Sequence, residues 1–457
     1  MPRPNHLLLS PRQFGLATDL YELTMAAGYR ENGINGRAVF ELFIRDLPAD
    51  RGYLIAAGLE QAVAYLRDLQ FTDDDAAFLR DHPSFRHVSD GFFDDLKRLR
   101  FTGDVWAVPE GTVVFAGEPL LRVEAPIIEA QIVETYLLTT LTYQTLVATK
   151  ASRIVGAAVG RGVVDFGSRR AHGPGAGLLA ARAAFIGGCQ GTSNVLAARL
   201  LGIPAVGTAA HAWTMAFDDE TAAFEAYVRV FPDGAILLVD TYDTLEGTRR
   251  AVAVARERLK AVRLDSGDLA SLSTAVLCIL DEAGLAGTKI VASGDLNEYR
   301  IADLLSAGAP IDLFGVGTDL VTGRDAPALG GVYKLVAVER DGAWRPCLKR
   351  SPGKATYPWP KQVYRRTDDA GRYVSDTIAR ADEDQPGTPL LLPVVRGGTP
   401  EDEWPDTAAI QARATAEVQR LDSGCRRLQG PAPYDVRVSD ALIRAAEEVG
   451  TPWATHR

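Results

Sequence analysis

The sequence is poor in cysteine, and the few cysteines that occur, Cys189, Cys278, Cys347 and Cys425, lie far apart. No two of them form a C-x-x-C pair, and no histidine stands near them at the spacing of a zinc site. This spacing argues against both a structural metal site and a disulfide framework. We therefore expect a protein of the reducing cytoplasm.

Long hydrophobic runs are also lacking. The apolar stretch near the N-terminus, Leu7 to Leu9, is too short for the core of a signal peptide, and no run approaches transmembrane length. Positive charge is in deficit, because 49 Lys and Arg face 59 Asp and Glu, giving a net charge of -10. This balance argues against nucleic acid and membrane partners, so that a pocket for an anionic small molecule would have to be local.

What the chain does contain is ample core material, with 47% apolar residues in 457. Residues 1–135 predict an α+β domain, since residues 104–125 alternate β-rich runs with proline and glycine turns, and helical periodicity follows from about residue 127 to 158. Residues 136–335 alternate strand and helix patterns. The predicted strands span residues 163–166, 204–208, 235–240, 261–265, 289–293 and 311–316.

Polar or glycine-rich clusters follow all six predicted strands at their carboxyl ends. An open doubly wound sheet concentrates ligand chemistry at one switch point, whereas a barrel collects it from many strand ends. We therefore predict an α/β fold with an irregular (β/α) barrel over residues 136–335, beside the smaller N-terminal α+β domain. Residues 336–457, with the basic loop 349–361, form either a third region or strands that return to the first domain.

The segment from Asp165 to Gly175 has the clearest pattern of an anion site. Arg169, Arg170 and His172 stand among glycines directly after a predicted strand. Glycines let the backbone approach a ligand closely, and an arginine fork holds a carboxylate or phosphate by two parallel hydrogen bonds. Whether Arg170 and His172 contact ligand or only pack the turn stays open.

A phosphate site is predicted at Gly315-Val-Gly-Thr318, which follows the apolar run 311–314 at the end of the last predicted strand. Gly315, Gly317 and the Thr318 hydroxyl can present hydrogen-bond donors there, and phosphate sites recur at the late strands of barrels.

His211 lies among small residues that leave its ring accessible. Asp240 ends the next strand, where in a barrel it could accept a hydrogen bond from one imidazole nitrogen and leave the other as a nucleophile or base.

The motif Arg-Leu-Asp-Ser-Gly-Asp contributes Arg263, Asp265 and Asp268. On a strand Arg263 and Asp265 point to the same face, so one site receives a cation and a carboxylate, unless the two form an internal salt bridge. A phosphorylated sugar would use both signs. Tyr21, in a helix predicted to begin near Thr18, would be assigned to the core on local pattern alone.

Taken together, these segments resemble the nicotinate phosphoribosyltransferases, which are type II phosphoribosyltransferases, from Thr18-Asp-Leu-Tyr to the loop 349–361. The resemblance implies an irregular α/β barrel and a homodimer with active sites at the subunit boundary. It also implies ATP-coupled synthesis of nicotinate mononucleotide and pyrophosphate from nicotinate and 5-phosphoribosyl 1-pyrophosphate, with Mg²⁺, in NAD salvage.

The resemblance further implies roles for individual residues. His211 would be phosphorylated transiently by ATP, Asp240 would orient it, and Phe166 and the partner subunit's Tyr21 would sandwich the pyridine ring. The other implied substrate contacts are Arg169, Thr208 and Arg263 around the nicotinate carboxylate and pyrophosphate, Asp265 near the ribose with Asp268 in the same motif, and Gly294, Gly315, Gly317 and Thr318 at the 5-phosphate. Mg²⁺ would be held mainly by pyrophosphate oxygens and water, without a metal site built from protein ligands.

The identity of the pyridine depends on Ser193. Related enzymes that use nicotinamide carry an aspartate at this position, so Ser193 with arginines nearby favours an acid over an amide. Quinolinate is disfavoured because enzymes for it do not use a phosphorylated histidine. The alternatives are therefore a nicotinamide or quinolinate phosphoribosyltransferase, or a non-catalytic sensor of phosphoribosyl ligands.

Overall fold

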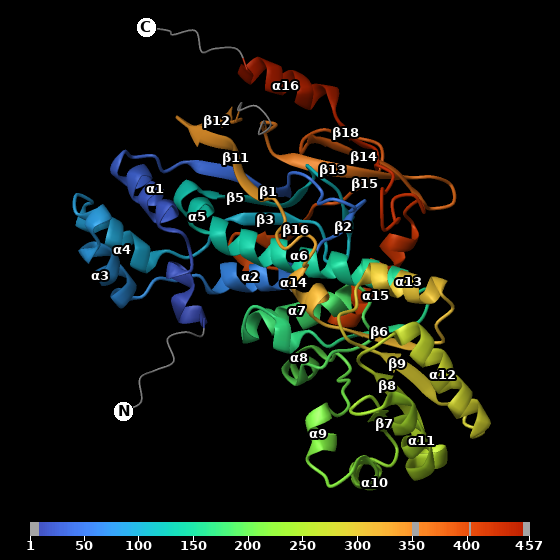
Figure 1. Cartoon of the computed structure of the whole chain (residues 1–457). Coiled ribbons are helices and arrows are strands. Elements are labelled where there is room, and N and C mark those ends of the chain that lie inside the picture. Colours follow the sequence, from blue (N-terminus) through green and yellow to red (C-terminus); the bar gives the residue numbers. More distant parts are fainter. Residues whose placement is uncertain (1–8, 350–355, 402–403, 451–457) are drawn as a thin grey trace.

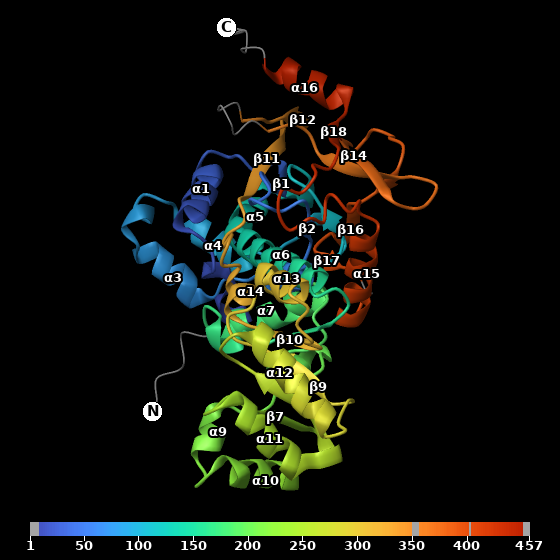
Figure 2. The same ribbon diagram turned by 45° about the vertical axis from the view of Figure 1, so that its right-hand side comes forward.

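The computed structural model describes residues 9–349, 356–401 and 404–450 (Figure 1). Residues 350–355 of the predicted basic loop lie outside this part of the chain. Within the described residues, no helix is long and apolar enough to cross a membrane. The backbone forms an upper body around an antiparallel sheet and a lower body around a parallel sheet (Figures 1 and 2).

The antiparallel sheet, which we call sheet A, combines strands from both ends of the chain. In spatial order its strands are β12 (Ala343–Pro346), β11 (Gly331–Arg340), β1 (Arg37–Ile44), β5 (Pro119–Pro126), β3 (Asp104–Ala107), β16 (Leu392–Arg396) and β17 (Thr399–Pro400). β1 pairs with β5 on one side and β11 on the other. The C-terminal region therefore returns strands to the N-terminal domain, which is one of the two arrangements that the sequence left open.

Helices cover the N-terminal part of this body. They are α1 (Leu20–Glu31), α2 (Leu59–Asp68), α3 (Asp73–Asp81), α4 (Asp90–Arg98) and α5 (Ile127–Ile132), with the 3-10 turns η1 (Pro11–Leu16) and η2 (Pro83–Phe85). The 24-residue helix α6 (Glu134–Ala157) follows and packs on both bodies. α5 and α6 confirm the helical periodicity expected from about residue 127 to 158.

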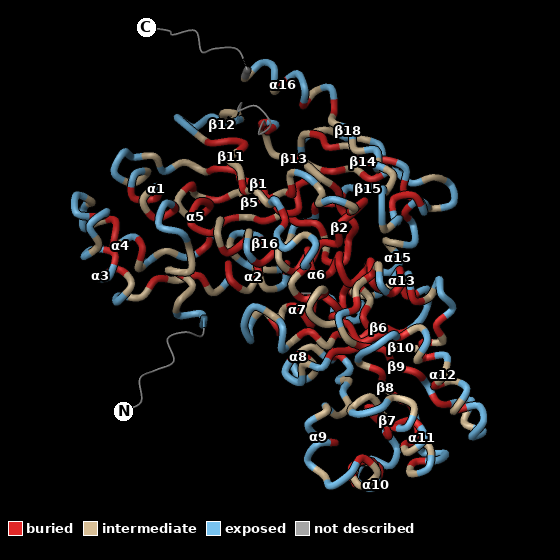
Figure 3. The backbone as a smooth tube through the Cα atoms, viewed as in Figure 1, coloured by how far each residue is buried: buried red, intermediate tan, exposed pale blue. Residues whose placement is uncertain are grey.

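The parallel sheet, which we call sheet C, has five strands. In spatial order they are β6 (Gly162–Asp165), β10 (Leu313–Val316), β9 (Lys289–Ala292), β8 (Leu259–Leu264) and β7 (Ala235–Leu238). Their inward residues form a second apolar core, separate from the one beneath sheet A (Figure 3). Five of the six predicted strands are confirmed, and with them the mixed α/β class.

The sixth predicted strand, residues 204–208, is wrong. Apart from the described strands, a parallel bridge joins Asp165 to Thr192 and another joins Thr192 to Ala205. Pro204 has no N–H to donate to a strand ladder, which shortens any pairing here. No ladder in the described chain connects this segment to β7, so the predicted closure into a barrel is not observed.

Helices alternate with the strands of sheet C. They are α7 (Pro174–Ile186), α8 (Val195–Leu201), α9 (His211–Met215), α10 (Glu220–Val230), α11 (Thr244–Ala255), α12 (Leu269–Glu282), α13 (Glu298–Ser306) and α14 (Thr318–Thr322), with η3 (Ser168–Arg170) and η4 (Arg256–Arg258). Because parallel strands end at the same edge, the loops that lead into these helices gather at one side of the sheet.

The remaining elements complete the upper body. A four-stranded sheet contains β15 (Thr388–Pro389), β13 (Lys361–Thr367), β14 (Tyr373–Arg380) and β18 (Val436–Val438), and a two-stranded sheet contains β2 (Leu54–Ile55) and β4 (Val113–Val114). The last helices are α15 (Thr407–Gln419) and α16 (Asp440–Gly450). α15 contacts α7, so the C-terminal region touches both bodies.

Candidate active site

Arg263 lies at the centre of the polar edge of sheet C. From β8 its guanidinium donates to Thr208 Oγ1 (2.8 Å), Ser293 Oγ (3.0 Å) and Asp265 Oδ1 (3.1 Å). The side chain is 12% exposed, so these contacts hold it in one geometry. Arg263 and Asp265 therefore share one face and also form the ion pair that the sequence left as the alternative.

His211 begins α9 and faces Asp265. Its Nε2 lies 3.8 Å from Asp265 Oδ2, and its Nδ1 lies 3.3 Å from Thr241 Oγ1. The His211 side chain is 37% exposed, which leaves the ring open to a ligand. The cluster thus places an imidazole, a carboxylate and a guanidinium next to one another at this edge of sheet C.

Asp240 has a different partner from the one expected. Its Oδ2 accepts hydrogen bonds from the backbone N of Asp265 (2.9 Å) and from Ser266 Oγ (2.7 Å), whereas its buried Oδ1 has no partner among the described residues. No hydrogen bond joins Asp240 to His211 in this part of the chain. Asp240 instead orients the loop that carries Asp265, because it binds that residue's own backbone.

The environment of Asp265 favours its ionised form. Burial by itself would raise the pKa of this carboxyl, but the Ser293 hydroxyl, the Arg263 guanidinium and His211 together hold the pKa below its ordinary value. Asp265 is therefore a carboxylate at neutral pH. A negative charge at this position stabilises positive charge that develops on a nearby ligand or on the imidazole.

Two glycines let the loops approach closely enough to form the site. A Cβ at Gly315 would lie 2.5 Å from the Phe166 ring, and a Cβ at Gly294 would lie 1.9 Å from the Asp265 backbone O. Gly294 also has a φ of +91°, which favours glycine. The Phe166 ring in turn lies 5.8 Å from Arg263 Cζ, so an aromatic wall and a cation adjoin each other.

Asp165 organises the opposite side of the site and was not predicted as a functional residue. Its buried carboxylate accepts hydrogen bonds from Gly167 N and Thr192 Oγ1, both at 2.7 Å, and its backbone O accepts one from Ser193 N at 2.8 Å. Burial raises the pKa of Asp165. An acidic residue at the end of an apolar strand, before Phe-Gly, was the signal that could have identified it.

The turn after Asp165 presents its arginines to solvent. Arg169 and Arg170 lie in η3, and they and His172 are exposed, as is Ser193. Asn194 Nδ2 donates to Ser168 Oγ (3.0 Å), which ties this turn to the start of α8. Arg169 and Ser193 therefore belong to one braced unit, with the arginine free to meet an anion.

Gly317 and Thr318 continue the site from β10. Gly317 precedes α14 and Thr318 begins it, directly after the Phe166-contacting Gly315. Asn297 Nδ2 donates to Asp319 Oδ2 (2.9 Å), which connects this turn with the one that follows Gly294. The structure thus brings the predicted glycine loops of β9 and β10 together.

The remaining two predicted substrate contacts are Asp268 and Tyr21. Asp268 is exposed and caps α12, accepting a hydrogen bond from Ala270 N (3.2 Å). Tyr21 is 44% exposed on α1, in the upper body and away from the edge of sheet C (Figures 1 and 2). Burial, followed by Glu134, raises the pKa of Tyr21, so its hydroxyl stays neutral.

Two carboxylates at the edge of sheet C could face a bound cation. Among the described residues, no group of three or more His, Cys, Asp or Glu side chains could hold a metal ion. The carboxylates of Asp240 and Asp265 lie close together at this edge, since the backbone N of Asp265 donates to Asp240 Oδ2 at 2.9 Å. Such a pair suits Mg²⁺ that brings water and ligand phosphates with it.

Parallel strands with glycine loops, an arginine paired to a carboxylate, an accessible imidazole and an aromatic wall define an α/β enzyme that acts on a small phosphorylated anion. Comparison with known proteins narrows this class. Models of the nicotinate phosphoribosyltransferase N-terminal domain, family and C-terminal domain match residues 16–142, 162–371 and 387–446. The chain belongs to the nicotinate phosphoribosyltransferase family, as its motifs predicted.

Individual relatives agree along most of the chain. Nicotinate phosphoribosyltransferase pncB2 of Mycobacterium tuberculosis (strain ATCC 25618 / H37Rv) is 47% identical over 94% of this chain and 92% of its own length. The nicotinate phosphoribosyltransferase of Bacillus subtilis (strain 168) is 46% identical over 80% and 76%. The crystal structure of human nicotinic acid phosphoribosyltransferase has a TM-score of 0.84 at 30% identity, covering 94% of this chain and 99% of that chain.

Proposed function

We propose that this chain transfers the phosphoribosyl group of 5-phosphoribosyl 1-pyrophosphate to nicotinate, giving nicotinate mononucleotide and pyrophosphate in NAD salvage. Membership of the family supports the reaction. The cluster of Arg263, Asp265 and His211 at the edge of sheet C is the observation that supports assigning the reaction to these residues. That cluster contains both signs of charge that the reaction requires.

Charge separation explains the roles of Arg263 and Asp265. As the bond from ribose C1 to pyrophosphate breaks, positive charge develops on the sugar and negative charge on the leaving group. The ionised Asp265 stabilises the sugar, and Arg263 with the exposed Arg169 stabilises the anionic groups. The pyridine nitrogen then forms the new bond to C1.

Nicotinate recognition would use Phe166 and the turn after it. The Phe166 ring offers one wall for the pyridine, and Arg169 offers a fork for its carboxylate, with Ser193 where an amide-specific site would need a carboxylate. Offset stacking of aromatic rings contributes roughly 0.5–1.5 kcal/mol beyond area burial. We propose that a second copy of the chain supplies the other wall, the partner subunit's Tyr21, in a homodimer. The exposure of Tyr21 on α1 supports this arrangement.

ATP coupling would pass through His211. The γ-phosphoryl group of ATP would transfer to an imidazole nitrogen with release of ADP, and hydrolysis of this phosphohistidine would drive the coupled reaction. The exposure of the ring and the carboxylate 3.8 Å away support the proposal, since the carboxylate stabilises the imidazolium. Mg²⁺ would neutralise phosphate charge when bound, with carboxylate oxygens of Asp240 and Asp265 as its protein ligands.

The four cysteines are all free thiols, which suits a reducing cytoplasm.

Product analysis tests the proposal. The protein is incubated with 5-phosphoribosyl 1-pyrophosphate, Mg²⁺ and one of nicotinate, nicotinamide or quinolinate, each with and without ATP. Nicotinate mononucleotide should form from nicotinate, and ATP should increase its yield. If product forms from nicotinamide or quinolinate and none forms from nicotinate, the substrate assignment is contradicted. If no product forms from any of the three pyridines, the result favours a non-catalytic sensor.

The shared site has its own test. Tyr21→Ala should raise the KM for nicotinate, and mixing it with a His211→Ala variant should restore ATP-coupled activity, because one site of the mixed dimer then contains both native side chains. If mixing under conditions that exchange subunits restores nothing, Tyr21 does not act across a dimer.

A further inference from the structure

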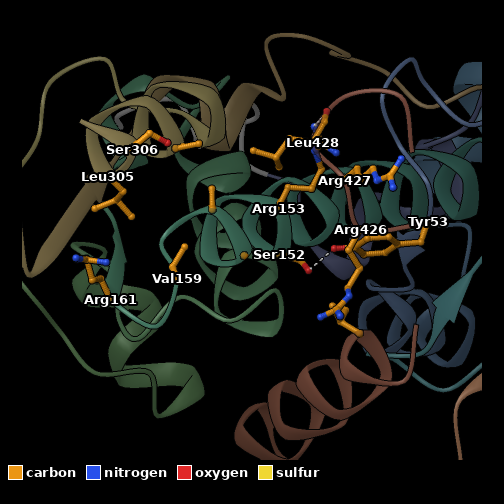
Figure 4. Close-up of a pocket in the computed structure, with 14 residues that line it drawn as sticks. Tyr53, Ser152, Arg153, Val159, Arg161, Leu305, Ser306, Arg426, Arg427 and Leu428 are labelled. Atoms are coloured by element: carbon orange, nitrogen blue, oxygen red, sulfur yellow. Dashed lines mark hydrogen bonds between the residues drawn. The ribbon is translucent and has the colours of Figure 1, made fainter. Parts of the chain in front are cut away.

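A cavity of about 600 Å³ lies at the amino end of β6, and its walls come from α6, α13, the end of α15 and the segment 426–428 (Figure 4). Arg161 precedes β6 and Phe166 follows it. The four strand residues between them span about 13 Å at ~3.3 Å each. The cavity is therefore distinct from the candidate active site, and it has the volume of a typical small-molecule pocket.

The charged lining of this cavity has one sign. Arg153, Arg161, Arg426 and Arg427 line it, and none of its described lining residues is acidic. The whole chain has a net charge of -10, so this concentration of cations reverses the charge of the molecule locally. Such a reversal attracts small anions that the remaining surface repels.

The four arginines fall into two groups. Arg153 is buried and already paired, since its Nε lies 3.0 Å from Glu298 Oε1 and its Nη2 donates to Tyr299 Oη at 3.1 Å. Arg161, Arg426 and Arg427 are exposed, and their guanidinium groups have no hydrogen bond or ion pair with the described residues. These three forks are therefore available to an anion.

The other lining groups complete a site for an amphipathic molecule. The Tyr53 hydroxyl lies 2.9 Å from Ser152 Oγ. Val159 is 72% exposed and has a φ of +48°, which is a costly conformation for a β-branched residue. Strained backbone of this kind is concentrated at ligand sites. Val159 and Leu305 supply apolar surface beside the arginines.

The lining is also arranged along an axis. In Figure 4, Arg426 and Arg427 lie at the end of the cavity that contains Tyr53 and Ser152, while Arg161 lies at the other end with Leu305 and Ser306. Inorganic phosphate would fill only one end. A longer molecule could place a phosphate at the end that contains Arg426 and Arg427 and an organic part along the apolar wall.

We propose that this cavity binds a phosphate monoester of nucleotide size, with the phosphate held by Arg426 and Arg427 and the organic part lying along Val159 and Leu305 toward Arg161. The ligand class follows from three unpaired guanidinium groups, a strained apolar wall and a volume of about 600 Å³. The site is additional to the one proposed for the phosphoribosyl transfer.

Calorimetric titration of the full chain with AMP, and separately with inorganic phosphate, tests the proposal. Arg426→Gln/Arg427→Gln removes the phosphate end. Its matched control is Arg86→Gln/Arg229→Gln, which makes the same charge change at two exposed positions outside the cavity. All four positions are exposed, so both double variants should melt like the native protein.

AMP should bind the native chain and the control equally, and should bind Arg426→Gln/Arg427→Gln at least about tenfold more weakly, with nicotinate turnover unchanged in the absence of AMP. AMP should also bind more tightly than phosphate. Equal AMP binding by all three proteins would overturn the proposal, because it would place the nucleotide elsewhere. Failure of the native chain to bind AMP, or equal affinity for AMP and phosphate, would overturn it as well.

Discussion

Two clusters of ionised side chains have nearly the same chemistry and opposite exposure. In the first, the active-site cluster, Arg263, Asp265 and His211 lie at the open edge of sheet C with side chains 12%, 25% and 37% exposed. In the second, which we call the α6–α13 network, Lys150 contacts Glu298 Oε2 at 2.6 Å and Asp325 Oδ1 at 2.8 Å. Lys150 and Glu298 are almost completely inaccessible.

The difference shows why an ion pair alone does not indicate function. In the α6–α13 network, Arg153 and Lys150 both bind Glu298, while Arg51 binds Asp325 at 2.7 Å, so the opposite charges pair with one another. Every member except Asp325 is buried. The active-site cluster leaves the imidazole accessible. We therefore expect substitutions in the network to change stability, and substitutions in the active-site cluster to change turnover.

The largest effect should come from Glu298→Ala. Removing this carboxylate leaves the buried Arg153 without a counter-charge and leaves Lys150 with Asp325 alone, which should lower the free energy of unfolding by about 3–5 kcal/mol. Urea unfolding at neutral pH measures the change. Glu282→Ala, an exposed position at the end of α12, is the control and should change stability little. A loss of less than ~1 kcal/mol in Glu298→Ala would remove the distinction between the two clusters.

Arg263→Lys should have the opposite effect, lowering turnover much more than stability. A lysine keeps the charge but cannot hold Thr208, Ser293 and Asp265 at once, so kcat/KM for nicotinate should fall by about 10²–10³-fold. Steady-state kinetics and a thermal melt, measured together, separate the two effects. If the melting temperature falls as far as in Glu298→Ala while residual turnover stays near native, Arg263 is structural.

His211→Ala sharpens the comparison within the active-site cluster. The partly exposed ring packs little, so the melting temperature should stay within a few degrees of the native value. Incorporation of γ-phosphate from ATP and the stimulation of nicotinate transfer by ATP should both be lost, while some uncoupled transfer continues. Retention of ATP stimulation in this variant would contradict the phosphohistidine.

The sequence predicted the strands that position the active-site cluster, but it did not predict the hydrogen bonds within the cluster. Apolar runs that end in polar or glycine residues identified five parallel strands, and parallel strands bring their carboxyl ends to one edge. Arg263 and Asp265 were predictable as neighbours because alternate residues of a strand share a face. The segment 204–208 has a similar composition, but Pro204 weakens its pairing.

Contacts between distant loops were beyond such reasoning. Asp240 binds the backbone of Asp265 instead of His211, since loop conformation places that N–H 2.9 Å from its carboxylate. Asp165 was missed as the residue that braces Gly167 and Thr192. The α6–α13 network could not be predicted either, because each of its ion pairs joins residues more than 100 positions apart and no local pattern marks them.

The smallest effect, and the one most specific to the network, concerns Asp325. Burial alone would raise the pKa of this carboxyl, but Lys150 and Arg51 lower it from an ordinary 3.8 to about 2. The folded state thus has the lower pKa, so the stabilisation is complete above pH ~4 and is lost as the pH falls toward 2. A shift of this size corresponds to about 2 kcal/mol.

Asp325→Asn should therefore be about 2 kcal/mol less stable than the native chain at pH 7 and at pH 5, and the difference should shrink when urea unfolding is repeated at pH 4 and pH 3. Asp303→Asn, which changes an exposed carboxylate on α13, should follow the native protein at every pH. A deficit in Asp325→Asn that stays constant from pH 7 to pH 3 would mean that the contribution of Asp325 comes from packing. The ion pairs of Asp325 with Lys150 and Arg51 would then not be what holds α6 near the segment after α14 that contains Asp325.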